Sequence, residues 1–166
     1  MRDVRFKIIP IFLLLILYAR AAFPFNEPDG FAGLKWGSSL AEIKAKHKKV
    51  IRDPSFEESP REVSYMADGK IGEFSATIDY HLVDGKLQAV TVQFYRVLFD
   101  DVLKAFVERY GQPTTAQDGA VWQGKNSLVL LWKKFPDIFA SIQSGSYQDF
   151  TLSRQKEKAK SAAKDL

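Results

Sequence analysis

The sequence predicts an α+β domain in which helices pack on one face of an antiparallel sheet of about six strands. Segments in which polar and apolar residues alternate are separated by short turns, as in hairpin-connected strands with one buried face. Two other segments carry apolar residues at helical spacing. The order is helix, three strands, helix, three strands and a helical tail, so two αβββ units in tandem are one interpretation of the chain.

Residues 22–30, rich in Pro, Asn, Asp and Gly, predict a loop, and a short extended segment is expected over 31–37. The first helix is predicted over 39–48. Ser39 and Glu42 have the spacing of a capping box, in which each side chain binds a backbone N–H of the other residue. The face expected to pack on the sheet carries Leu40, Ile43 and His47.

Three strands are predicted next, over 62–67, 74–83 and 87–95. Asp68-Gly69 and Asp84-Gly85 are interpreted as the turns that follow the first two strands, because Asp-Gly pairs favour hairpin turns. Side chains on a strand alternate between its two faces, so the polar residues of the second and third strands should share one wetter face. That face is the candidate binding surface, and it carries Thr77, Asp79, His81, Thr91 and Gln93.

The clearest helix is predicted over 100–110, where one apolar stripe repeats at helical spacing. Asp100 and Asp101 stand at its positive end, where the helix dipole favours carboxylates. Gly111 provides a left-handed stop, and Pro113 prevents the helix from continuing.

Three further strands are predicted over 120–123, 127–133 and 138–143. Residues 128–132 are nearly all apolar, which predicts a central strand buried on both faces. The single domain is therefore expected to span 31–152. The pattern after Tyr147 favours a helix, and the basic tail 153–166 is expected to be helical or frayed.

Residues 1–21 have the composition of a secretory signal peptide. Basic residues precede an apolar run over 8–18, and small residues follow at the spacing of a cleavage site after Ala21 or Ala22. The apolar run is shorter than the roughly 20 residues that a membrane-spanning helix needs. We therefore expect an exported protein, periplasmic or secreted, with no stable membrane anchor after cleavage.

The chain has 24 Lys and Arg residues, 20 Asp and Glu residues and no Cys. Its formal net charge of +4 comes mainly from residues 1–21 and 153–166, so the body between them is close to neutral. A nucleic-acid-binding domain would carry a basic face, and we expect no nucleic-acid partner. The absence of cysteine excludes disulfides, thiol catalysis and a lipid anchor attached to a cysteine after the leader.

Three motifs resemble small exported bacterial proteins of unknown function: residues 33–40, the hairpin around Asp84-Gly85, and residues 110–113 followed by Trp122. The step from helix through Gly-x-Pro to strand is similar, more weakly, to small outer-membrane-assembly lipoproteins of the BamE/SmpA type and to the β-lactamase-inhibitor-protein fold. This resemblance implies binding to other proteins and supplies no catalytic residues. The chain departs from the lipoproteins in lacking the lipidation cysteine.

Catalytic and metal-ligating candidates are few. His81 and Asp79 share one strand face and form half of a catalytic triad, with Ser75 or Thr77 as a conceivable nucleophile. Strand alternation explains the same residues more simply. Two histidines without cysteine provide no zinc spacing. We therefore expect no enzyme activity, no metal and no cofactor.

A basic ridge near the first helix is a further candidate surface. It could meet an anionic lipid or glycan, although a solvated helix face explains it more simply. The ridge consists of Lys44, Lys46, Lys48, Lys49 and Arg52.

Three functions are ranked from these observations. The first is a non-catalytic binding or assembly module of the cell envelope that receives an envelope protein or peptide on the wetter sheet face or on a strand edge. The second is a small-molecule or lipid carrier, in which Phe and Trp line a cleft between sheet and helix that opens to solvent. The third is a hydrolase that uses Asp79 and His81, which requires both side chains to meet a nucleophile in a pocket.

Overall fold

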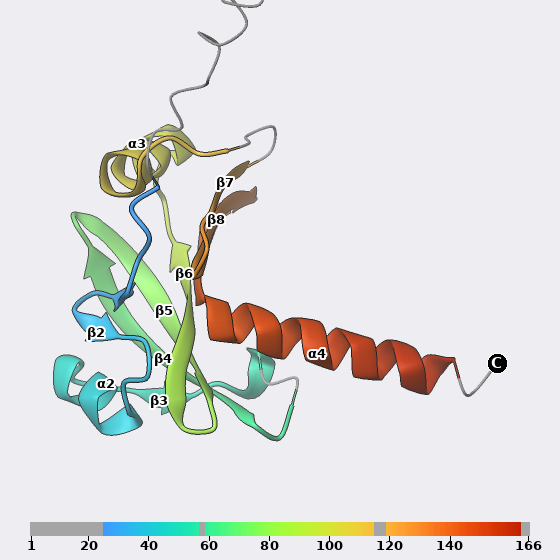
Figure 1. Ribbon diagram of the computed structural model, residues 1–166. Coiled ribbons are helices and arrows are strands. Elements are labelled where there is room, and N and C mark those ends of the chain that lie inside the picture. Colours follow the sequence, from blue (N-terminus) through green and yellow to red (C-terminus); the bar gives the residue numbers. More distant parts are fainter. Residues whose placement is uncertain (1–24, 57–58, 115–118, 164–166) are drawn as a thin grey trace, which may run out of the picture.

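A computed structural model describes residues 25–56, 59–114 and 119–163. Its main sheet has seven antiparallel strands in the order β3-β4-β5-β6-β9-β8-β7 (Figure 1). The α+β class is therefore confirmed. The predicted leader and the last residues of the tail lie outside the described residues. The strands are β3 (Ile51–Arg52), β4 (Glu62–Ile71), β5 (Phe74–Val83), β6 (Lys86–Phe94), β7 (Gly119–Gln123), β8 (Ser127–Lys134) and β9 (Asp137–Ser144).

The strand order divides the sheet into two three-stranded halves. β4-β5-β6 and β7-β8-β9 are each connected by hairpins, and antiparallel pairing of β6 with β9 joins them. A helix precedes each half: α2 (Leu40–Lys46) comes before β4, and α3 (Phe99–Tyr110) comes before β7. This is the arrangement expected of two αβββ units in tandem.

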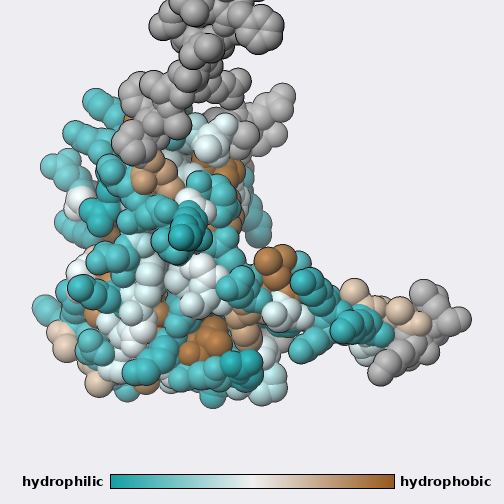
Figure 2. Space-filling model, viewed as in Figure 1, coloured by the Kyte–Doolittle hydropathy of each residue, from teal (hydrophilic) through white to brown (hydrophobic). Residues whose placement is uncertain are grey.

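The third long helix, α4 (Gly145–Ala162), lies on the opposite face of the sheet from α2 and α3. It starts directly after β9, where the hydroxyl of Ser144 accepts a hydrogen bond from the backbone N–H of Tyr147. Its first turns pack on the sheet, and the rest projects away from the body (Figure 1). Figure 2 shows that this projecting part is mostly hydrophilic. The basic tail is thus helical as far as Ala162, and the expectation of helices on one face holds for α2 and α3 only.

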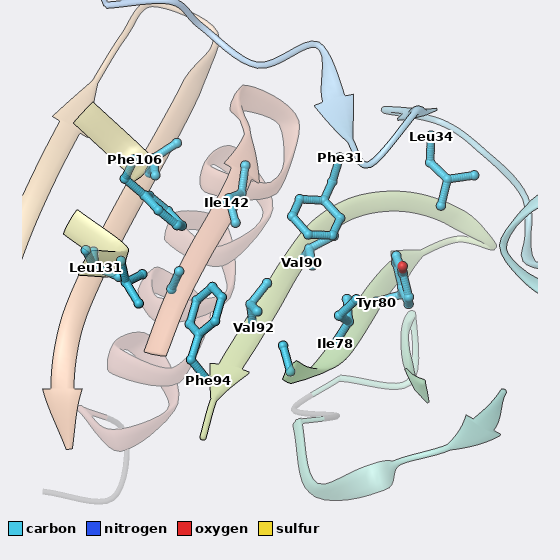
Figure 3. Close-up of a cluster of buried hydrophobic side chains, with 14 of the residues drawn as sticks. Phe31, Leu34, Ile78, Tyr80, Val90, Val92, Phe94, Phe106, Leu131 and Ile142 are labelled. Carbon is cyan, nitrogen blue, oxygen red and sulfur yellow. The ribbon is translucent and has the colours of Figure 1, made fainter. Parts of the chain in front are cut away.

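The core lies between α2, α3 and the face of the sheet that they cover, which we call the inner face. The small hairpin of β1 (Gly30–Phe31) and β2 (Leu34–Lys35) also packs there, and Figure 3 shows Phe31 reaching from β1 toward Val90 of the sheet. Burial of a large apolar side chain contributes about 1.5–3 kcal/mol, which explains how the chain folds without disulfides. The largest fully buried apolar side chains are Trp122, Tyr80, Phe94, Ile43, Ile78, Leu82, Leu87, Leu131 and Ile142.

The predicted helix boundaries are largely confirmed. Both hydrogen bonds of the capping box between Ser39 and Glu42 are present. α2 ends at Lys46, so His47 stands just after the helix, with its Nε2 2.7 Å from Oη of Tyr80. Gly111 adopts φ +87° and donates its backbone N–H to Val107, which ends α3 where the sequence predicts.

Two sequence predictions are wrong. Asp68-Gly69 is not a turn, because β4 and β5 stay paired from Glu62↔Val83 to Ile71↔Phe74, and the chain reverses only at Gly72. β8 is not buried on both faces. It is the second strand from the sheet edge, and its outer face is only partly covered. Three of its apolar side chains are consequently only half-buried: Leu128, Leu130 and Trp132.

Candidate functional site

The five predicted site residues do lie together, on the outer face of β5 and β6. Thr77 pairs with Gln93, and Asp79 pairs with Thr91. His81 follows Asp79 by two residues on the same face of β5. On β5, however, this face is almost inaccessible to solvent, because Thr77, Asp79 and His81 are only 7%, 5% and 4% exposed. Thr91 and Gln93 are half-buried. This part of the sheet is therefore poorly suited to bind a protein or peptide on an open surface.

α4 closes this face through a carboxylate that sequence reasoning did not single out. Glu62 on β4 is 1% exposed. Its Oε1 accepts a hydrogen bond from Tyr147 Oη at 2.7 Å, and its Oε2 accepts one from Arg154 Nη1 at 2.9 Å. Burial alone would raise the pKa of Glu62, but hydrogen bonds from His81 and Tyr147 and the charge of Arg154 hold it below its usual range. The only sequence signal was that Tyr147 and Arg154 share one face of a helix, seven residues apart.

Ser64, His81 and Glu62 have the composition of a catalytic triad without its geometry. Ser64 Oγ lies 2.9 Å from His81 Nδ1, and Glu62 Oε1 lies 3.6 Å from the same nitrogen. In a triad, the nucleophile and the carboxylate bind opposite nitrogens of the ring. Nε2 of His81 instead bonds Thr91 Oγ1 at 3.0 Å. Ser64 is wholly buried, and neither hollow described below is lined by Asp79 or His81, so the geometry does not favour the hydrolase.

Asp79 is the least satisfied group in this face. Its Oδ1 is buried without a hydrogen-bond partner among the described residues. Burial raises the pKa of Asp79 to about 6, although the charge of His81 lowers it, and the nearby carboxylate of Asp53 raises it further. Within the described ranges, no group of three His, Cys, Asp or Glu residues could hold a metal ion.

An apolar cleft opens between α3 and the end of the β4–β5 hairpin, two elements that lie next to each other in Figure 1. Its volume is about 510 Å³, within the range of small-molecule sites. Phe94 and Phe106 form an aromatic floor, with ring centroids 6.3 Å apart, and the ring of Phe74 at the rim lies 6.2 Å from that of Phe94. Exposed Ala105 and Gly72 stand at its rim. The residues lining the cleft include phenylalanines but no tryptophan.

A second, basic hollow of about 510 Å³ lies between the end of α2 and the last residues of β4. The structure places part of the predicted basic ridge here. Lys46, Lys48 and Lys49 line the hollow with Lys70 from β4, whereas Lys44 and Arg52 do not. Its other lining residues include Asp68, which accepts a hydrogen bond from Thr77 Oγ1 at 3.1 Å.

The two edges of the main sheet differ in what they offer for strand addition. β3 has only two residues and pairs with Tyr65 and Met66 alone, so on that side the end of β4 has no strand partner among the described residues. The outer side of β7 is partly occupied, because the backbone N–H and the hydroxyl of Thr114 both donate to the carbonyl of Val121, at 2.7 and 2.8 Å. A peptide would have to displace Thr114 to pair with the middle of β7.

The outer face of β7 and β8 carries mostly apolar side chains that are only half-buried, and Phe139 of β9 adjoins them. Trp132 and Phe139 stack on it, with centroids 5.8 Å apart and planes inclined by 17°. Figure 2 shows hydrophobic atoms exposed in the angle between the body and the base of α4. We call this set of half-buried side chains the β8 patch: Val121, Leu128, Leu130, Trp132 and Phe139.

Comparison with family models, with curated proteins and with solved structures yields no match for this chain. Among the described residues, no helix is both long enough and apolar enough to cross a membrane. The ligands of this protein are therefore inferred from the shape and chemistry of its own hollows and faces.

Proposed function

We propose that this chain is a non-catalytic, exported binding protein that carries an apolar ligand in the cleft between α3 and the β4–β5 hairpin. The observation that carries the proposal is an apolar, aromatic-floored cleft that opens to solvent. From the sequence, a protein-binding module was the first hypothesis and a carrier the second. The buried polar residues of β5 and the partly occupied edge of β7 weaken the binding-module hypothesis. The carrier hypothesis requires an apolar cleft that opens to solvent, and the cleft beside α3 meets that requirement. Export is inferred from the composition of residues 1–21.

The lining of the cleft suits an alkyl chain. Phe94 and Phe106 are buried beneath it, whereas Phe74 and Ala105 are reached by water at its rim. Water in contact with such a surface gains few hydrogen bonds, so its displacement by a hydrocarbon is favourable. Each methylene group that moves from water into the cleft should contribute about 0.8 kcal/mol.

The test is calorimetric titration of the mature protein with octanol and decanol. Two additional methylene groups should tighten binding by about tenfold. Ala105→Trp should abolish binding, because the indole would fill the cleft from its exposed rim without replacing a core residue. The matched control is Ala159→Trp, which adds the same ring to an exposed position of α4.

Retention of binding in Ala105→Trp would rule out this cleft as the site. Failure of both alcohols to bind the unmodified protein would rule out the carrier function. Thermal unfolding of both tryptophan variants checks that the fold is intact, since neither substitution replaces a buried side chain.

A second candidate function, binding of an envelope protein, is favoured by the β8 patch. Apolar residues occupy both faces of β8, and those on the outer face are only half-buried. A photo-crosslinker at position 130 should then capture a partner in the cell, and Trp132→Ser should abolish that capture without unfolding the protein. Equal capture from exposed position 104 on α3 would count against a specific partner at this patch.

A further inference from the structure

The apolar cleft and the basic hollow are neighbours, and Lys70 lines both. We infer that the ligand is an anionic amphiphile, with its chain in the cleft and its anionic head in the basic hollow. This inference rests on the proposed function, because the chain must occupy the cleft for the head to reach the lysines. The inference adds to the proposed function the chemical class of the ligand, an amphiphile with an anionic head.

Two elements bring lysine residues to the boundary between the hollows. Lys70 comes from the end of β4, after which the chain turns into the rim of the cleft at Gly72. Lys46 comes from the end of α2 and reaches the β1–β2 turn. A Cβ built on Gly33 would lie 3.0 Å from Lys46 Nζ, and the preceding residue, Ala32, lines the cleft. A head group at this boundary would therefore meet the ammonium group of Lys46 beside the cleft.

The charges in the basic hollow are unbalanced. Lys46, Lys48, Lys49 and Lys70 line the hollow together with a single carboxylate, that of Asp68. Asp68 and Lys70 both project from the outer face of β4, where Asp68 accepts a hydrogen bond from Thr77, so Lys46, Lys48 and Lys49 carry the unbalanced charge. Such an excess of lysine creates a positive potential that an oxyanion would relieve. Lysine side chains are flexible point charges, so they can converge on phosphate or carboxylate oxygens.

The shape of the two hollows favours an amphiphile over a free anion. A small anion would use the lysines and leave the aromatic cleft exposed to water. At the far rim of the cleft, Arg109 lies over the ring of Tyr110, 5.6 Å from its centroid, and is accompanied by Glu108. The charge near that rim is therefore locally balanced, and the excess positive charge stands at the Lys70 end.

The experiment compares decyl phosphate, decanol and inorganic phosphate by calorimetry, with both amphiphiles below their micelle concentrations. Decyl phosphate should bind the unmodified protein roughly tenfold more tightly than decanol, and this advantage should shrink as salt screens the lysines. The double variant Lys46→Gln, Lys70→Gln should lose the advantage and keep the affinity for decanol. The matched control is Lys104→Gln, Lys156→Gln, which removes the same charge from exposed positions outside both hollows.

The outcomes separate this inference from the proposed function. Equal affinity for decyl phosphate and decanol, or equal loss in the control variant, would overturn the anionic head while leaving the carrier function standing. Inorganic phosphate binding as tightly as decyl phosphate would also overturn the inference, because the chain would then contribute nothing. If neither amphiphile binds, the carrier function fails as well.

Discussion

The two halves of the outer sheet face differ in an instructive way. Over β4-β5-β6 the outer face is polar and yet buried, with His81 and Asp79 almost inaccessible. Over β7 and β8 it is mostly apolar and yet half-exposed, with Leu130 and Trp132 reached by solvent. Alternation along a strand therefore predicts which side chains share a face, but it does not predict whether that face is covered.

The position of α4 produces this difference. Its first turns reach back across the sheet, so that Tyr147 and Arg154 meet the carboxylate of Glu62. Phe150 lies between two guanidinium groups, with Arg61 and Arg154 each 5.6 Å from its ring centroid. The buried ionic contact with Glu62 thus holds α4 against the polar half, while the side chains of the β8 patch stay half-buried.

The largest expected effect comes from breaking this contact. Glu62→Ala leaves Arg154 and Tyr147 without their carboxylate in a buried setting, which should lower the free energy of unfolding by about 3–5 kcal/mol. Urea denaturation measures the loss. The control is Asp84→Asn, which removes the charge of the exposed ion pair between Asp84 and Arg61, tolerates the positive φ of this turn position and should change stability little. Equal losses in the two variants would mean that α4 is not held by Glu62.

Two neighbouring leucines of β8 sharpen the comparison. Leu131 points into the core and is 1% exposed, so Leu131→Ala should destabilise the protein by about 2–5 kcal/mol. Leu130 belongs to the outer β8 patch, and Leu130→Ala should cost clearly less, because that side chain is only half-buried. Urea denaturation of both variants measures the difference. A similar cost at both positions would show that the outer face is covered in solution.

The smallest effect concerns Asp79. Its pKa of about 6 in the folded protein lies above the value of about 4 in an unfolded chain, so folding takes up a proton between these pH values. The unmodified protein should therefore lose stability as the pH rises from about 4 through 6. Asp79→Asn cannot ionise and should be more stable by about 1–3 kcal/mol at pH 8, an advantage that disappears near pH 4. Thermal unfolding across this range measures it, and an advantage independent of pH would contradict the assignment to ionisation.

Local physics explains what the sequence predicted well. The capping box of Ser39 and Glu42 and the stop at Gly111 each depend on residues a few positions apart. Asp84 and Gly85 both have positive φ in the tight β5–β6 turn, as an Asp-Gly pair favours. The turn predicted at Asp68-Gly69 was wrong, because the same dipeptide can lie within a strand when the partner strand keeps pairing beyond it. No local rule distinguishes the two cases.

The sequence predicted the kind of site, a cleft between sheet and helix, but not the residues that line it. A Phe-lined cleft between sheet and helix was among the hypotheses, but its residues were not, because Phe31, Phe74 and Phe106 come from separate elements. The basic ridge was recognised near α2, whereas Lys70, which connects it to the cleft, was not.

By itself, the sequence determined the α+β class, the ends of α3 and the division of each strand into an apolar and a polar side, because these depend on spacing and on neighbouring residues. The tertiary structure alone decided that Glu62 meets Arg154, that the outer apolar side of β8 stays half-exposed and that Lys70 lines two neighbouring hollows. These features arise where elements distant in sequence pack together, and the free energy of such contacts is not encoded in any short segment.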